Sequence, residues 1–389
     1  MPTATGQRRL SQIAPLILQS EIRSMSVECE RIGGVNLAQG VCDTELPALV
    51  AEGAVNAIHS GWNTYTRLDG IAPLREAIAG KLAAFNGIRA DPDTEILVTA
   101  GATGALYAAS LALLDPGDEV ILFEPFYGYH WNTMLSLRAM PVAVPLHAPE
   151  WQLDVARLRE SITPRTRAIL VNTPSNPCGK VFSLEELEAI AELAIEHDLF
   201  VFTDEVYEHF LFDGNRHISI ATLPGMFKRT ITICGLSKTF SITGWRVGYL
   251  AASREWVPTI GYFHDLVYIC APGPLQYGAA AGLIGLPASF YGDISREYQQ
   301  KRDQLCAALS DAGLPPSIPA GAYYVLADAS RIPGVTAAKK ARTLLAATGV
   351  AAVAGSAFFA SGGEENLLRF CFGKKPEALD RACCALRTL

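Results

Sequence analysis

One lysine lies among hydroxyl residues and glycines in the stretch SKTFSITGWRVGYL, residues 237–250. Lys238 follows the apolar run TITIC (230–234), and Arg246 comes eight positions later. A lysine in a partly desolvated site has a lowered pKa and can attack a carbonyl carbon. Ser237 can offer a hydroxyl and Arg246 a charged fork to a phosphate. This spacing therefore indicates covalent chemistry beside an anion.

Polar side chains also follow two other apolar runs. LFVFTDEVY (199–207) delivers Asp204 and Tyr207. A carboxylate at the end of an apolar strand is costly to bury unless it meets a cation, although a helix N-cap is the plainer alternative. RAILVNTP (167–174) leads into NTPSNPCGK, where Asn176 offers hydrogen bonds; a rigid proline turn is the alternative there.

Two further runs end in small or aromatic residues. EILVTA (95–100) is followed by GATG (101–104) and then a helical pattern, so the N–H groups of Ala102 and Thr103 can cradle an anion. EVILFEP (119–125) leads to Tyr127, whose ring can stack on a flat ligand. A plain tight turn and ordinary packing remain the alternatives, and the dinucleotide spacing G-x-G-x-x-G is absent.

Taken together, these five positions describe one ligand. It is flat and aromatic, it carries a phosphate and a cationic ring nitrogen, and it has an aldehyde that a lysine can capture. The sequence therefore predicts pyridoxal 5′-phosphate (PLP) as the cofactor and no metal.

The elements that must position these residues alternate along the chain. Short apolar runs with helical patterns between them predict an α/β fold with a mostly parallel sheet buried on both faces, and ligands bind beyond the carboxyl ends of such strands. Ser183 and Glu186 form a capping box that starts a helix over 183–198. The last hundred residues differ: a long helix (295–313) precedes two strands (321–330 and 366–373).

This pattern predicts two domains. We expect a large PLP-binding domain over 46–288 and a smaller α+β domain formed by 1–45, as an N-terminal arm, together with 289–389. A chain of 389 residues is long enough for both.

Composition limits the partners and the compartment. A formal net charge of −7 gives no reason to expect a nucleic-acid partner. The sequence shows neither a signal peptide nor a run of about 18 apolar residues, so we expect a cytoplasmic protein without a membrane span. Nine scattered cysteines without C-x-x-C spacing indicate reduced thiols rather than a structural zinc site.

The motifs S-K-T-F-S-x-x-G-W-R-x-G (237–248) and NTPSNPCGKVF (172–182) resemble those of the class I/II aminotransferases, which are PLP enzymes of fold type I. The likeness extends from VNLAQG (35–40) to LLRFCFG (367–373), and it is greatest to the branch with kynurenine, glutamine and methionine aminotransferases. The resemblance implies an exchange of an amino group between an L-amino acid and a 2-oxo acid.

The resemblance also implies a role for each site residue. Lys238 forms the aldimine and moves the Cα proton, and Asp204 pairs with the ring nitrogen. The other cofactor contacts are Asn176 and Tyr207 at the ring oxygen, Tyr127 on the ring face, and Ala102, Thr103, Ser237 and Arg246 at the phosphate. Gly40 and Asn176 border the substrate, and Arg369 grips its α-carboxylate. Tyr65 is similar to the tyrosine that reaches the partner's phosphate, which implies a homodimer with shared sites.

One loop departs from the family pattern and leaves the reaction open. Val41, Cys42, Asp43, Thr44 and Glu45 stand where the family usually has an aromatic-Pro-Asp sequence, and Ser175 replaces a usual histidine. The alternative to transamination is a PLP-dependent β- or γ-elimination, replacement or cyclisation on the same fold. A non-catalytic regulator is a further alternative, but Lys238 is present and there is no basic face. The sequence shows no clear second arginine for a dicarboxylate substrate, which favours neutral or aromatic amino acids.

Overall fold

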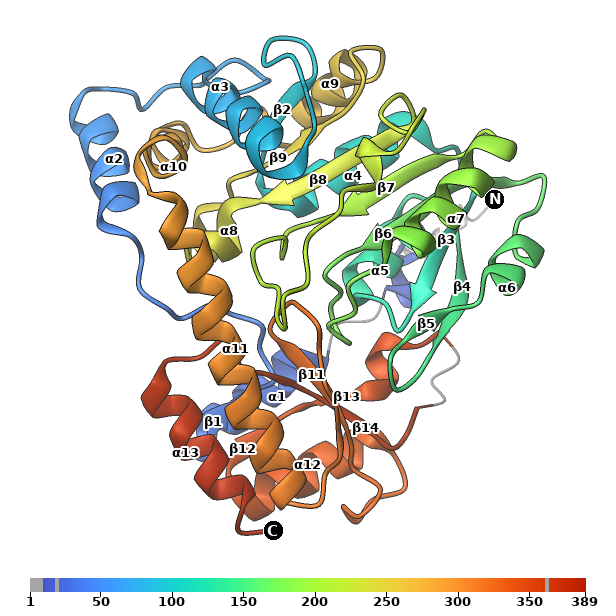
Figure 1. The fold of residues 1–389 in the computed structure, drawn as a ribbon, viewed down its shortest axis with the longest axis vertical. Coiled ribbons are helices and arrows are strands. Elements are labelled where there is room, and N and C mark those ends of the chain that lie inside the picture. The colour runs from blue at the N-terminus through green and yellow to red at the C-terminus, as the bar shows by residue number, and fades with distance from the viewer. Residues whose placement is uncertain (1–9, 18–20, 361–363) are drawn as a thin grey trace, which may run out of the picture.

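A computed structural model describes residues 10–17, 21–360 and 364–389, so parts of the expected N-terminal arm (1–9 and 18–20) lie outside the described residues. Its larger sheet has eight strands (Figure 1). In spatial order they are β2 (Ile96–Thr99), β9 (Gly248–Ala251), β8 (Thr230–Gly235), β7 (Phe200–Asp204), β6 (Thr166–Asn172), β3 (Glu119–Glu124), β4 (Met140–His147) and β5 (Gln152–Leu153).

The expected α/β fold is confirmed. The neighbours β4, β3, β6, β7 and β8 pair in parallel. β9 runs antiparallel to both β8 and β2, and β5 runs antiparallel to β4. Because β9 reverses the direction, β2 points the same way as β8, and its carboxyl end lies at the same edge of the sheet.

Helices cover both faces of this sheet. Its strands are apolar runs without polar alternation, so both of their faces must be buried. Along β3, Val120 and Leu122 pack on one face with α4 (Gly101–Leu113), and Ile121 packs on the other face with α7 (Leu184–Glu196). The remaining helices of this part are α2 (Ala48–His59), α3 (Ala72–Lys81), α5 (Gly128–Ser136), α6 (Val155–Glu160), α8 (Leu236–Thr239), α9 (Val257–Tyr268) and α10 (Gly273–Gly285).

The capping box predicted at the start of α7 is confirmed. Ser183 Oγ accepts the Glu186 backbone N–H at 3.2 Å, and the Glu186 carboxylate accepts the Ser183 N–H at 3.0 Å. The long helix α11 (Ala288–Asp311) starts seven residues before the predicted position, directly after Pro287, and ends close to Gly313.

A smaller sheet lies apart from the large one, at the lower end of the molecule in Figure 1. Its order is β10 (Pro316–Ser317), β11 (Tyr324–Asp328), β14 (Leu367–Cys371) and β13 (Val353–Ala354). β1 (Val35–Asn36) pairs in parallel with β12 (Val350–Ala351) beside it. The surrounding helices are α1 (Glu21–Arg31), α11, α12 (Ala337–Thr348) and α13 (Pro376–Leu386).

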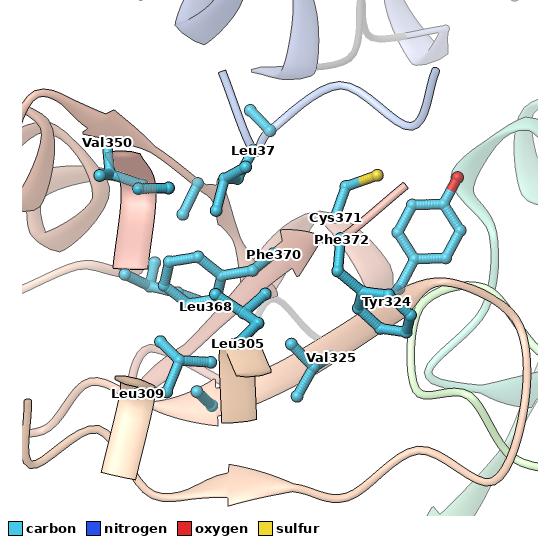
Figure 2. Close-up of a cluster of buried hydrophobic side chains, with 14 of the residues drawn as sticks. Leu37, Leu305, Leu309, Tyr324, Val325, Val350, Leu368, Phe370, Cys371 and Phe372 are labelled. Atoms are coloured by element: carbon cyan, nitrogen blue, oxygen red, sulfur yellow. The ribbon is translucent and has the colours of Figure 1, made fainter. Parts of the chain in front are cut away.

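The core of this smaller part joins segments from both ends of the chain. Figure 2 shows Leu37, from the N-terminal segment, against Phe370 and Leu368 of β14, with Leu305 and Leu309 of α11 nearby. All five side chains are fully buried. Tyr324 lies at the edge of this cluster, and its hydroxyl points away from it (Figure 2).

Two expectations from composition concern membrane spans and cysteines. None of the helices within the described ranges is long and apolar enough to cross a membrane. All nine cysteines are free thiols, and seven of them are buried.

Candidate active site

A cavity of about 640 Å³ lies at the carboxyl edge of the large sheet, where the segment before α2 and the smaller sheet close it. Every site residue predicted to act within its own chain lines it. These residues are Gly40, Ala102, Thr103, Tyr127, Asn176, Asp204, Tyr207, Ser237, Lys238, Arg246 and Arg369.

One wall of the cavity is the start of α4. Gly101 has a left-handed φ of +74°, and a Cβ there would lie 2.6 Å from Arg246 Nη2, so only glycine allows the guanidinium this close. The first N–H groups of an α-helix lack partners within the helix, and those of α4 face the same wall. Arg246 itself has a φ of +55° and is held by Thr243 O at 3.0 Å from Nη1. This wall suits an anion.

Lys238 lies in α8, directly after β8. Its Nζ donates to the Gly40 carbonyl oxygen at 3.2 Å and lies 5.6 Å from the centre of the Tyr323 ring. Burial lowers the pKa of the Lys238 amine below its usual value. The amine is therefore neutral at a lower pH than a surface lysine would be, as a nucleophile or base requires.

Asp204 ends β7 and faces the cavity. Its Oδ2 lies 2.8 Å from His130 Nε2, and its Oδ1 accepts the Val206 N–H at 3.2 Å. The Asn172 side chain donates to the backbone oxygen of Asp204 at 3.1 Å. The carboxylate is thus fixed in position, with its partner histidine on the first turn of α5.

Arg369 is buried on β14 of the smaller sheet, and it hydrogen-bonds to Asn176, which follows β6 of the larger sheet. Nη1 donates to Asn176 Oδ1 at 2.9 Å and Nη2 to Ala38 O at 2.6 Å. The guanidinium carbon lies 4.4 Å from the Tyr324 ring centre and 4.9 Å from that of Phe358. Nε has no hydrogen-bond partner among the described residues, although it is buried. An unsatisfied donor on a buried cation suits an anionic ligand such as a carboxylate.

Three tyrosines and a glycine shape the rest of the cavity. The hydroxyls of Tyr207 and Tyr324 are 3.0 Å apart, and burial raises the pKa of Tyr207, and that of Tyr324 to about 12, so both stay protonated. A Cβ on Gly40 would lie 1.9 Å from the Tyr324 hydroxyl, so this position needs glycine. The Tyr127 ring stacks on Tyr129, with ring centres 5.2 Å apart.

Sequence reasoning missed several residues of this site. His130 stands three positions after Tyr127, and its closeness to a predicted site residue was a usable signal. Tyr323 and Tyr324 sit in a predicted strand with no motif to mark them. Arg23 and its neighbours on α1 line the cavity mouth, and no pattern in the sequence places that helix there.

Two features of the sequence lie outside this cavity or at its edge. Tyr65, which the resemblance assigns to the partner's site, is 79% exposed and does not line the cavity of its own chain. In the unusual loop, only Val41 lines the cavity, whereas Cys42 is buried against other residues.

The groups around the cavity form a set with defined chemistry. A guanidinium, a helix N-terminus and the Ser237 hydroxyl favour a phosphate at one wall. A fixed carboxylate, Asp204, favours a cationic nitrogen, and a desolvated amine, Lys238, favours a carbonyl carbon. Arg369, with its orphaned donor, favours a carboxylate. The residues present therefore fit PLP together with an amino or 2-oxo acid.

Known proteins share this fold and this arrangement. Residues 32–386 match the family model "Aminotransferase class I and II". A probable N-succinyldiaminopimelate aminotransferase of Mycobacterium tuberculosis is 38% identical, with 94% of each chain covered. The human kynurenine–oxoglutarate transaminase 1 is 34% identical, with 89% of this chain and 90% of the relative covered. A crystal structure of an Escherichia coli protein with a methionine aminotransferase function superposes with a TM-score of 0.94 at 32% identity, covering 98% of this chain and all of the other.

The chain belongs to the class I and II aminotransferases. It is an enzyme of fold type I that transfers an amino group between an amino acid and a 2-oxo acid. The resemblance stated from the motifs is thereby confirmed.

Proposed function

We propose that the cavity binds PLP and that the residues predicted from the sequence hold it. The observation that carries this proposal is the complementary set of charges: Arg246 and the start of α4 at one wall, Asp204 at another, and the desolvated Lys238 between the sheets. When bound, PLP supplies a carbonyl carbon for the amine and a ring that accepts electrons from the substrate Cα.

The residues of this chain supply the rest of the chemistry. Lys238 would hold the cofactor through its amine, and the same amine, whose lowered pKa favours the neutral form, is placed to take the proton from the substrate Cα. Asp204 holds the proton on the ring nitrogen, and His130 fixes that carboxylate. Arg369 binds the α-carboxylate and so orients the Cα–H bond toward Lys238. Asn176 and Tyr207 would offer hydrogen bonds to the ring oxygen, and Tyr127 would pack against the ring; all three line the cavity.

The test is a half-reaction with purified enzyme and single amino acids, without any 2-oxo acid. A transaminase releases at most one 2-oxo acid per site, because the amino group stays on the enzyme. Repeated turnover with release of ammonia would instead show elimination. Lys238→Ala is the control, and turnover by this variant at the wild-type rate would overturn the role given to the lysine.

The structure gives no support to the alternative reactions. The unusual loop 41–45 is the feature that favours elimination, replacement or cyclisation, and it contributes only Val41 to the cavity lining.

We also propose the domain division 46–288 against 1–45 with 289–389. Its support is that β1 pairs with β12, and Leu37 packs on β14, so the described N-terminal residues associate with the C-terminal part. The helix α11 begins at Ala288.

A further proposal is that the enzyme is a homodimer and that Tyr65 completes the partner's phosphate site. Large apolar side chains stay exposed on neighbouring segments, and such groups mark interfaces. They are Trp62, Tyr65, Tyr262, Leu266, Val267 and Ile269. The segment with Trp62 and Tyr65 packs against the start of α10, because the Trp62 and Tyr277 rings are 5.4 Å apart and Gln276 Nε2 donates to Thr66 Oγ1 at 3.2 Å.

Mixed dimers test the shared site. A Lys238→Ala subunit combined with a Tyr65→Phe subunit has one intact site if Tyr65 acts across the interface, and that site is fully active. If Tyr65 acts within its own chain, both sites are damaged and no wild-type site forms. Sedimentation of the wild-type enzyme as a monomer would refute the dimer itself.

A further inference from the structure

The loop that departs from the family pattern has a structural role in this chain. Cys42 is 4% exposed, and its Sγ lies 2.7 Å from Tyr298 Oη, 3.2 Å from Thr44 Oγ1 and 3.4 Å from Ser241 Oγ. Thr44 Oγ1 and Ser241 Oγ are 2.5 Å apart. We name these four residues the Cys42 cluster. The cluster engages the Cys42 thiol and the Thr44 hydroxyl, and neither residue lines the cavity.

The Cys42 cluster joins three elements that meet at the lysine. Ser241 follows α8, and its backbone N–H donates to the Lys238 carbonyl oxygen at 3.3 Å. Ser241 has a φ of +57°, which is uncommon for a residue other than glycine and requires support from its surroundings. Tyr298 lies on α11 and is 2% exposed, with its ring 4.8 Å from that of Phe210.

The backbone held by this cluster carries the acceptor of the catalytic amine. Gly40 O accepts Lys238 Nζ at 3.2 Å and Tyr323 Oη at 3.3 Å. Gly40 is two residues before Cys42, so the chain between them has few ways to move while Cys42 stays in place. On the other side, the Tyr324 hydroxyl blocks movement of Gly40.

We propose that Cys42 and Thr44 are positioning residues: through Ser241 and Tyr298 they hold the Gly40 carbonyl oxygen against the Lys238 amine. This proposal rests on the function proposed for Lys238. It assigns the unusual loop to the orientation of the lysine during proton transfer, not to contact with the substrate side chain.

The chain offers variants that separate this role from general packing. Cys42→Val removes the hydrogen bonds and adds about one methyl group, Cys42→Ser keeps a hydrogen-bonding group, and Thr44→Val replaces only a hydroxyl by a methyl group. Cys306→Val is the matched control, because Cys306 is buried in the same core on α11 and has no contact with Lys238. Thermal unfolding of each variant reports any change in stability.

The expected result is a lower kcat at an unchanged KM. Cys42→Val and Thr44→Val should each lose about fivefold in kcat, as expected for one net hydrogen bond. Cys42→Ser should stay within about twofold of the wild type, and so should Cys306→Val.

A second readout follows from the environment of the lysine. The titratable and charged groups that face it are Asp204, Arg246, Cys42, Cys371 and Tyr323. A carbonyl acceptor favours the protonated form of the lysine nitrogen, so a loosened Gly40 lowers the pKa of that nitrogen, both when it is free and when it is bonded to the cofactor. The absorbance of the bound cofactor, titrated against pH, should then change at a lower pH in Thr44→Val, which leaves all five groups in place.

The outcomes are distinct. Wild-type kcat and an unshifted titration in both valine variants would overturn the proposal while leaving the function of Lys238 intact. An equal loss of kcat in Cys306→Val would show that the effect comes from packing, and this result too would overturn the proposal. Activity in Lys238→Ala would instead refute the proposed function. If Cys42→Val does not fold, Thr44→Val decides the matter.

Discussion

Replacing Arg369 by lysine should separate charge from geometry at the carboxylate end of the cavity. The arginine uses Nη1 and Nη2 on Asn176 and Ala38, and its buried Nε has no partner among the described residues. Lysine keeps the positive charge but cannot reproduce a planar fork of donors. The variant should therefore bind a carboxylate through one fewer charge-assisted hydrogen bond.

The magnitude follows from that count. A hydrogen bond to a charged group contributes about 1.5–3 kcal/mol, so kcat/KM for an amino acid should fall about 10- to 150-fold. The assay compares each amino acid with the corresponding amine that lacks the α-carboxylate. The amine has no carboxylate for the guanidinium to bind, so its turnover should change less than about twofold.

Two results would refute this reasoning. An unchanged kcat/KM for amino acids would mean that Arg369 does not bind the carboxylate. Equal losses for amino acid and amine would mean that it acts by packing against Tyr324 and Phe358. Arg381→Lys, an exposed arginine of α13, is the control for preparation and handling.

Three other changes have outcomes that the structure predicts. Asp204→Asn should still bind the cofactor at the phosphate wall. Removal of its partly buried charge should slow Cα proton transfer about a hundredfold or more, measured by loss of deuterium from Cα-labelled substrate; an unchanged rate would remove its assigned role. His264 accepts the Ala100 N–H at 2.9 Å, and burial lowers its pKa to about 4. The unfolded chain therefore binds the proton first, and the free energy of unfolding should fall as the pH drops from about 6.5 toward 4. His264→Gln should reduce that slope in urea titrations, and an identical slope would contradict the assignment. Ser183→Ala should lower the free energy of unfolding by about 1 kcal/mol without changing kcat, because it removes the cap of α7 far from the cavity; a loss of kcat at full occupancy of the cofactor would show that α7 matters to the site.

Much of the large sheet could be predicted because each of its parallel strands is an apolar run followed by a polar or small residue. That pattern places Asp204, Lys238 and Asn176 at one edge without any knowledge of packing. The sequence alone does not separate β9 from the motif that precedes it, because the motif that contains Arg246 continues directly into the strand at Gly248. β4 contains two prolines, which argue against a strand in a sequence read alone.

The residues that sequence reasoning missed depend on tertiary contacts. His130 meets Asp204 only because α5 turns back over the end of β7. Tyr324 meets Tyr207 only because the smaller sheet closes on the larger one. The helix expected over 295–313 begins earlier, at Ala288, and α11 continues through Gly292, a residue of low helix propensity.

The pairing of β1 with β12 also has a consequence for biosynthesis. Val35 pairs with Val350, so the first strand must wait for its partner until nearly the whole chain has been synthesised. At about 5–20 residues per second, that delay lasts about 15–60 s, during which the apolar side of α1 and Leu37 have no core to join. A nascent chain that stalls before residue 350 already contains the lysine but lacks the arginine at 369. The carboxylate-binding arginine is therefore among the last parts of the proposed site that the ribosome adds to this enzyme.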